Sequence, residues 1–94
     1  MTTTKRIDSP RAALLADAIE HYGVVRQQMK AVEELSELIR ALARADDPDN
    51  IAEEMADVRI MLDQLEIIFG NHLDVRRHEI MKLERLAARI NAEG

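Results

Sequence analysis

VVRQQMKAVEELSELIRALARA, residues 24–45, is the stretch that decides the fold class. It contains no glycine or proline and is rich in alanine, leucine, glutamate, glutamine and arginine, which favour helix in the interior of a segment. The sequence DDPD at 46–49 then interrupts the helical pattern. We therefore predict one long helix over 24–45, followed by a sharp turn.

A shorter helix is predicted before this one. Ser9-Pro10 is typical of an N-cap followed by proline at the first helical position, so it opens a helix over 10–22. Gly23 supplies the stop. The next helix then begins almost at once.

Two more helices are predicted after the turn. Asn50, with Glu53 three residues later, resembles a capping box and opens a third helix that ends at Phe69. Gly70 is placed to stop that helix. A fourth helical period runs from residue 73 or 74 to 91.

The architecture expected from these segments is a single all-α domain over residues 1–94. Short connections make 24–45 and the third helix a central antiparallel hairpin within a four-helix bundle. No strand-like alternation is present, and residues 1–8 and 92–94 read as frayed ends. The chain has only two aromatic residues, so its core consists mainly of aliphatic side chains, which bury less area per residue. We therefore expect oligomerisation to complete the bundle.

Composition excludes several functional classes. The net charge of −5 argues against a protein held mainly by nucleic-acid phosphates. The absence of cysteine excludes a thiolate metal site and a cysteine nucleophile, and suits a reducing compartment. No apolar run approaches the ~20 residues that span a bilayer, so we expect a cytoplasmic protein without a membrane partner.

Two acidic motifs occupy the central hairpin: EELSEL at 33–38 and EEMADV at 53–58. Each contains a carboxylate pair at i, i+3, namely Glu34/Glu37 and Glu54/Asp57, a spacing that places both side chains on one helix face. Spacing alone is weak, because acidic helices contain many such pairs by chance.

Their position around each helix is the stronger observation. On the third helix Glu54 falls inside the main apolar stripe and Asp57 on its margin. The stripe of this helix is Ile51, Met55, Val58, Met61, Leu62, Leu65, Ile68 and Phe69. On 24–45, Glu34 lies at the edge of the stripe and Glu37 next outward. That stripe is Val32, Leu35, Leu38, Ile39 and Leu42. If the two stripes pack together, four carboxylates face a shared and partly dry space.

Such a space needs a counter-charge, because burying adjacent carboxylates is costly. Oxygen ligands without histidine or cysteine suit Mg²⁺, with Mn²⁺ as the alternative. The competing interpretation is structural: Glu54 sits near a helix start, where the dipole favours an anion, and the other carboxylates form a solvated face.

The fourth helix carries a row of basic residues, His78, Lys82, Arg85 and Arg89. A row of cations beside carboxylates is what a polyphosphate requires, whereas a purely solvent-facing stripe is the simpler interpretation. The apolar stripe of this helix is Leu73, Ile80, Leu83, Ala87 and Ile90.

The third helix also has a second apolar line on its far side, Ala56, Ile60 and Ile67. A helix that is apolar on two sides is buried on two sides, which a short monomer achieves only in part. We therefore expect a homodimer, with a homotetramer as the larger alternative.

The order of these motifs resembles the MazG-like all-alpha nucleoside triphosphate pyrophosphohydrolases, in particular their short single-domain members. The resemblance covers about residues 27–89 and includes the closing MKLERLAARI. It implies that Glu34, Glu37, Glu54 and Asp57 bind Mg²⁺. It leaves Glu33 and Glu53 as acidic neighbours of less fixed role, and it implies that Lys82 and Arg85 bind the phosphates of the substrate.

The activity implied by the resemblance is hydrolysis of a nucleoside triphosphate between the α and β phosphates, in the manner of nucleotide-pool house-cleaning. Glu37 and Glu33 are the two candidates for the general base. The main alternative is a non-catalytic helical module that oligomerises or regulates a partner. A di-iron bundle is a poor alternative because no histidine follows a carboxylate at i+3.

Overall fold

The computed structural model describes residues 9–94, and over this range the chain is all-α without any strand. The four helices are α2 (Pro10–Tyr22), α3 (Val24–Ala43), α4 (Pro48–Phe69) and α5 (His72–Glu93). The predicted all-α class and its four helices are confirmed. The predicted frayed segment 1–8 lies outside the described residues, whereas residues 92 and 93 belong to α5 instead of a frayed end.

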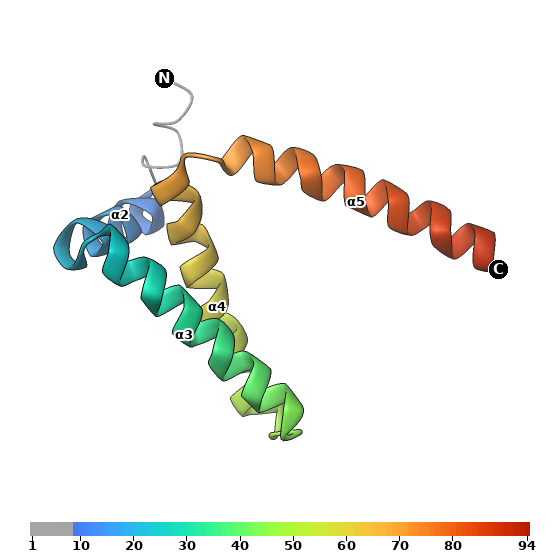
Figure 1. Ribbon diagram of the computed structural model, residues 1–94, viewed down its shortest axis with the longest axis horizontal. Helices are drawn as coiled ribbons and strands as arrows, with labels where there is room; N and C mark the ends of the chain where they lie inside the picture. Colours follow the sequence, from blue (N-terminus) through green and yellow to red (C-terminus); the bar gives the residue numbers. More distant parts are fainter. Residues whose placement is uncertain (1–8) are drawn as a thin grey trace.

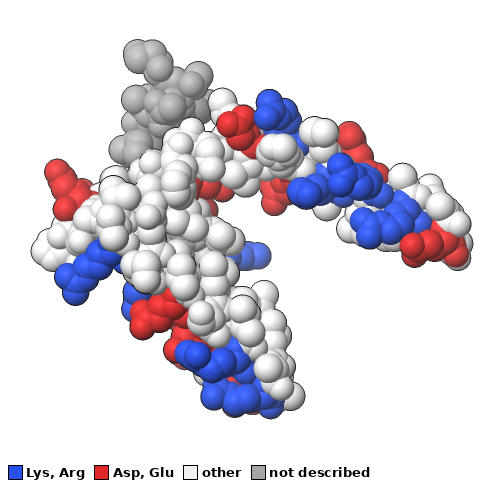
Figure 2. Space-filling model, viewed as in Figure 1, with Lys and Arg blue, Asp and Glu red and all other residues white. Residues whose placement is uncertain are grey.

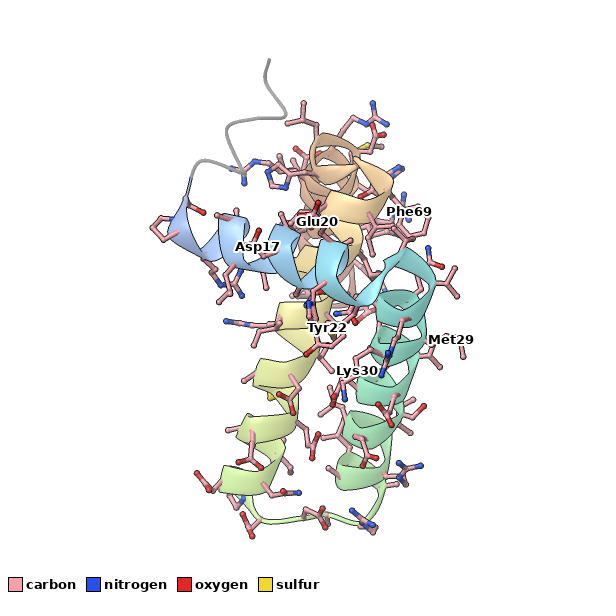
Figure 3. All side chains as sticks on the ribbon, turned by 90° about the vertical axis from the view of Figure 1, so that its left-hand side faces the viewer. Asp17, Glu20, Tyr22, Met29, Lys30 and Phe69 are labelled. Atoms are coloured by element: carbon pink, nitrogen blue, oxygen red, sulfur yellow. The ribbon has the colours of Figure 1, made fainter. Side chains whose placement is uncertain are left out.

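The first two helices meet at a single residue. Ser9 Oγ accepts a hydrogen bond from the Ala12 N–H at 3.0 Å, which confirms the predicted N-cap. Gly23 alone separates α2 from α3, and its φ of +96° lies in a region that favours glycine. The chain therefore changes direction abruptly, and α2 lies across the α3–α4 hairpin (Figure 3).

Helix α3 ends at Ala43, two residues earlier than predicted. The reason is local: Ala45 has a φ of +55°, a left-handed conformation that cannot continue the helix. The Asp46 N–H then donates to the Ala41 carbonyl at 3.0 Å and closes the helix end.

Helix α4 begins at Pro48, before the predicted start. The Asp47 side chain accepts a hydrogen bond from the Asn50 N–H at 2.9 Å, so Asp47 is the N-cap and Pro48 takes the first helical position. The predicted capping box of Asn50 and Glu53 is therefore wrong. Gly70 ends α4 with a φ of +61°, as predicted.

The hairpin packs through small and polar residues. On α3 the residues turned toward α4 are Gln27, Ala31, Glu34, Leu38 and Ala41, at alternating spacings of four and three. Ala31 and Ala41 are only 2% and 1% exposed, and small side chains let the two helices approach closely.

The predicted packing stripe of α3 is therefore wrong in all but one position. Of that stripe only Leu38 is half-buried, and Ile39 is 66% exposed. Helix α3 is rotated relative to the prediction because its alanines, instead of its larger apolar residues, meet α4. The other four stripe residues, Val32, Leu35, Ile39 and Leu42, are exposed.

The predicted apolar stripe of α4 is confirmed in part: Ile51, Val58, Met61, Leu65 and Ile68 are buried or half-buried. The helix also buries Gln64, and it exposes three residues of this stripe, Met55, Leu62 and Phe69. By helical periodicity in an antiparallel pair, these three lie on the same side of the hairpin as the exposed stripe of α3. We call this surface the hairpin face: Val25, Val32, Leu35, Ile39, Leu42, Met55, Leu62 and Phe69.

Helix α2 packs on the hairpin with Ala12 and Leu15 buried, and the Arg11 guanidinium pairs with the Asp63 carboxylate of α4.

Of the second apolar line on α4, Ile67 is half-buried, whereas Ala56 and Ile60 are exposed. Among the described helices, none is long and apolar enough to cross a membrane.

Helix α5 extends away from the other three helices (Figure 1). Of the described helices it contacts only α4, and none of its residues is buried. The radius of gyration is 16.1 Å, against about 12 Å for a compact chain of this length. The apolar stripe of α5 is therefore not covered within the single chain: Leu73, Ile80, Leu83, Ala87 and Ile90 are all exposed.

Candidate metal and phosphate site

Three of the four predicted metal-binding carboxylates come together across the hairpin. Glu34 of α3 and Glu54 and Asp57 of α4 each place a carboxylate oxygen within 4.8 Å of the other two. All three residues are half-buried. We call Glu34, Glu54 and Asp57 the acidic cluster; they meet because the rotated packing turns these positions of α3 and α4 toward each other.

The electrostatics of the acidic cluster are unfavourable to full ionisation. Partial removal from water raises the pKa of Glu54, and the negative charges of the nearby carboxylates raise it further, Asp57 first, then Glu37, Glu34 and Glu53. An excess of negative charge therefore surrounds Glu54.

Among the described residues, Lys30 is the cation that contacts the acidic cluster. Its Nζ lies 3.2 Å from a carboxylate oxygen of Glu34 and 3.2 Å from one of Glu33. These two contacts raise the pKa of Lys30 and keep it charged. One lysine pairs with one member of the acidic cluster and leaves Glu54 and Asp57 without a basic partner among the described residues.

Glu37, the fourth predicted ligand, lies outside the group of three. Its carboxylate accepts a hydrogen bond from Arg40 at 2.6 Å. It is close enough to raise the pKa of Glu54, so it belongs to the same electrostatic environment. The two acidic neighbours, Glu33 and Glu53, are exposed.

The predicted phosphate-binding residues are not at the acidic cluster within this chain. Lys82 and Arg85 are exposed on α5, which contacts neither α2 nor α3. Lys and Arg side chains gather along α5, away from the hairpin (Figure 2). His78 and Arg89 are likewise exposed on this helix.

The residues of the acidic cluster fit a hard divalent cation. They offer carboxylate oxygens alone, without histidine or cysteine, which is the ligand chemistry of Mg²⁺ and Mn²⁺. A bound cation also removes the unfavourable charge that raises the pKa of Glu54.

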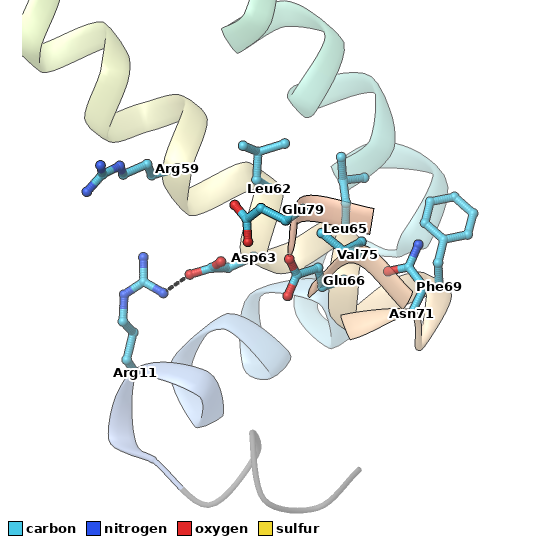
Figure 4. Close-up of a pocket in the computed structure, with 10 residues that line it drawn as sticks. All are labelled: Arg11, Arg59, Leu62, Asp63, Leu65, Glu66, Phe69, Asn71, Val75 and Glu79. Atoms are coloured by element: carbon cyan, nitrogen blue, oxygen red, sulfur yellow. Dashed lines mark hydrogen bonds and ion pairs between the residues drawn. The ribbon is translucent and has the colours of Figure 1, made fainter. Parts of the chain in front are cut away.

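A second hollow, on the α2 and α5 side of α4, has a different character (Figure 4). Asp63 pairs there with Arg11, and Glu66 lies 2.8 Å from His72 Nδ1. Both of these carboxylates have a basic partner, and the third carboxylate of the hollow, Glu79, lines it together with Arg59. This hollow therefore lacks the charge imbalance of the acidic cluster.

A groove of about 850 Å³ adjoins the acidic cluster on the other side, where the end of α2 crosses the hairpin. Tyr22 and Lys30 both extend toward the space between α3 and α4 (Figure 3). The groove also contains the buried side chains of Gln27 and Gln64, and Glu34 and Asp57 reach its edge. We call it the side groove.

The sequence analysis missed the buried glutamines, because it assigned no role to Gln27, Gln64 or Tyr22. A pattern in the sequence could have indicated them: Gln27 lies seven residues before Glu34, and Gln64 lies seven residues after Asp57, so each glutamine shares a helix face with a carboxylate. Read as a packing stripe, this spacing would have placed both amides in the interface.

In comparisons with known proteins, no protein-family model, curated protein or solved structure matches the chain.

Proposed function

We propose that the chain is a Mg²⁺-dependent nucleoside triphosphate pyrophosphohydrolase of the MazG-like kind, which cleaves between the α and β phosphates to give a nucleoside monophosphate and pyrophosphate. The observation that carries the proposal is the acidic cluster, in which the oxygens of Glu34, Glu54 and Asp57 lie within 4.8 Å of one another. The raised pKa of Glu54 indicates that this arrangement calls for a cation.

Glu34, Glu54 and Asp57 would hold the Mg²⁺, with Glu37 beside them. When bound, the ion neutralises charge on the phosphate oxygens. Glu37 or Glu33 would accept a proton from the water that attacks the α phosphorus. As the bond from this phosphorus to the bridging oxygen breaks, pyrophosphate leaves with the electron pair.

The remaining basic groups would come from a second copy of the chain. Lys82 and Arg85 lie on a helix that contacts only α4, so phosphate binding by these residues at the acidic cluster requires the α5 of another subunit. The hairpin face is a continuous, exposed apolar surface of the kind that marks an interface. A homodimer or homotetramer would cover it.

We place this activity in the cytoplasm, where a chain without cysteine meets reducing conditions and its nucleotide substrates.

The direct test is pyrophosphate release from a panel of nucleoside triphosphates with Mg²⁺. We expect Glu54→Gln to abolish release, because it removes a ligand and a charge from the acidic cluster. Glu53→Gln is the matched control: Glu53 is the neighbouring residue, is exposed and lies outside the cluster. It should retain most of the activity. Equal activity in wild type and Glu54→Gln would remove Glu54 from the reaction.

A second candidate function is a non-catalytic helical module that oligomerises or regulates a partner. The exposed hairpin face and the unpacked α5 favour it, because both are surfaces that another protein can cover. Absence of pyrophosphate release from every nucleotide, together with self-association, would support this candidate over the enzyme.

A further inference from the structure

The side groove contains the two buried polar side chains of the described residues, Gln27 and Gln64. They are 7% and 4% exposed, and Gln27 Nε2 donates a hydrogen bond to Gln64 Oε1 at 2.7 Å. The pair joins α3 to α4 at a place where leucine or methionine would pack at lower cost, because a buried amide loses its bonds to water.

The amide pair is only partly satisfied. Each glutamine amide can donate two hydrogen bonds and accept two. Gln64 Nε2 has only the sulfur of Met61, at 3.7 Å, as an acceptor. Gln27 Oε1 accepts no hydrogen bond from any described residue. The pair therefore holds spare donors and acceptors beside a space large enough for a small molecule.

Tyr22 stands at the same groove with its ring half-exposed. The Arg26 guanidinium lies 5.7 Å from the ring centroid, and the His21 ring meets it edge-on with centroids 4.6 Å apart. These contacts hold the phenol ring in place. A half-exposed aromatic ring beside amide donors and acceptors matches a ligand that has both a flat face and a polar edge.

The side groove and the acidic cluster are continuous. Glu34 and Asp57 belong to both, and Lys30, which also lines the groove, contacts Glu34 at 3.2 Å. Gln27 precedes Glu34 by seven residues, which is about 10.5 Å along a helix. A nucleotide bound with its phosphates at the acidic cluster would therefore extend its base toward the amide pair.

We propose that the side groove binds the base of the nucleotide, with the base stacked on Tyr22 and its polar edge hydrogen-bonded to the amide pair of Gln27 and Gln64. This assignment rests on the proposed function for the choice of a nucleotide as ligand. It names the residues that distinguish a nucleotide from a triphosphate without a base, and so determine which substrates the enzyme accepts.

The test uses fluorescence, because Tyr22 is the one tyrosine of a chain without tryptophan. The full-length protein is titrated with AMP, GMP, CMP and UMP in the presence of Mg²⁺, which offsets the repulsion between the phosphate and the acidic cluster. Ribose 5-phosphate serves as the ligand without a base, and free N-acetyltyrosinamide corrects for absorbance by the nucleotide. We expect at least one nucleotide to quench the tyrosine saturably, and ribose 5-phosphate to leave the emission unchanged.

The variant Gln27→Leu with Gln64→Leu should weaken the binding of that nucleotide by about tenfold or more, the loss expected for one good base contact. Replacing both partners by apolar residues keeps the fold, because no amide is left unpaired. Gln28→Leu is the control, since Gln28 does not line the groove; its Kd should stay within about twofold. Tyr22→Leu, measured by calorimetry, provides a second variant with the same expected loss.

Three results would overturn the assignment: no saturable quenching by any nucleotide, equal quenching by ribose 5-phosphate, or an unchanged Kd in both the double variant and Tyr22→Leu. The test is separate from that of the proposed function. Glu54→Gln should still bind nucleotide, so a chain that binds bases but releases no pyrophosphate would keep the base site and refute the hydrolase.

Discussion

Ile39 is the residue at which self-association is most directly tested. It belongs to the hairpin face and is 66% exposed in the single chain. We expect Ile39→Glu to dissociate the oligomer and to leave the helices of the monomer intact, because few contacts within the chain are lost.

The size of the effect follows from the exposed fraction. Complete burial of an isoleucine side chain stabilises by about 1.5–3 kcal/mol, so covering the exposed two-thirds of Ile39 contributes about 1–2 kcal/mol. In a symmetric dimer the substitution removes this contribution from both subunits, so the dimer loses about 2–4 kcal/mol of binding free energy. At about 1.4 kcal/mol per tenfold change, the dimer Kd should rise by about 30- to 700-fold, and the glutamate charge adds to this.

The assay is sedimentation equilibrium over a range of protein concentrations, with circular dichroism as the check of helix content. Ala52→Glu places the same charge at an exposed position of α4 outside the hairpin face and should leave the Kd unchanged. A wild-type chain that is monomeric at every concentration, or an Ile39→Glu variant with the wild-type Kd, would refute the reasoning.

Three further predictions concern a turn, a charge and a shared site. Ala45→Gly should raise the free energy of unfolding by about 0.5–1 kcal/mol in urea titrations, because the left-handed φ of +55° costs alanine more than glycine loses in chain entropy. Glu54→Gln should stabilise the metal-free protein at pH 7 but not at about pH 4. Because the pKa of Glu54 is raised in the folded state, its carboxyl group favours folding below its usual pKa, and this contribution is lost as the pH rises through the folded pKa. At pH 7 the folded protein therefore carries an unfavourable charge that the glutamine removes. Equal gains at both pH values would contradict this. Mixing two inactive chains, Glu54→Gln and the double variant Lys82→Ala with Arg85→Ala, should restore pyrophosphate release, because mixed oligomers contain one intact site if α5 acts on another subunit; no recovery in the mixture would place the basic pair elsewhere.

Most of the helix ends could be predicted from the sequence. Ser9 as N-cap, Gly23 as separator and Gly70 as the left-handed stop each follow from residue chemistry that acts within one helical turn. The exceptions are also local. Two acceptable caps, Asp47 and Asn50, stand three residues apart, and Pro48 decides between them by filling the first helical position.

The packing was harder to predict because apolar residues were taken to mark the interface. On α3 most of the interface consists of small or polar residues, and of the larger apolar residues of the predicted stripe only Leu38 belongs to it. Hydrophobicity measures the free energy of transferring a side chain out of water. It does not say whether an apolar surface packs within the chain or against a second molecule. The exposed stripes of α3 and α5 are therefore correct as apolar surfaces, but they are not packed within the chain.

The acidic cluster was predicted in part. Glu34, Glu54 and Asp57 converge because each lies on the face of its helix that turns toward the other helix, whereas Glu37 is held at the side by Arg40. The placement of Lys82 and Arg85 could not follow from sequence, since helical periodicity gives the face of α5 and not the direction in which the helix leaves Gly70.

The central claim is that the acidic cluster binds a divalent cation, and the most direct measurement is the thermal unfolding of the substrate-free protein with and without Mg²⁺, at matched ionic strength and fixed protein concentration. At about 100 times the Kd, bound Mg²⁺ should stabilise the wild type by about 2.7 kcal/mol and raise its Tm by about 10–20 °C. Glu53→Gln should show the same shift and Glu54→Gln none. A wild type that does not respond to Mg²⁺ or Mn²⁺, or a Glu54→Gln variant that responds as the wild type does, would contradict the claim.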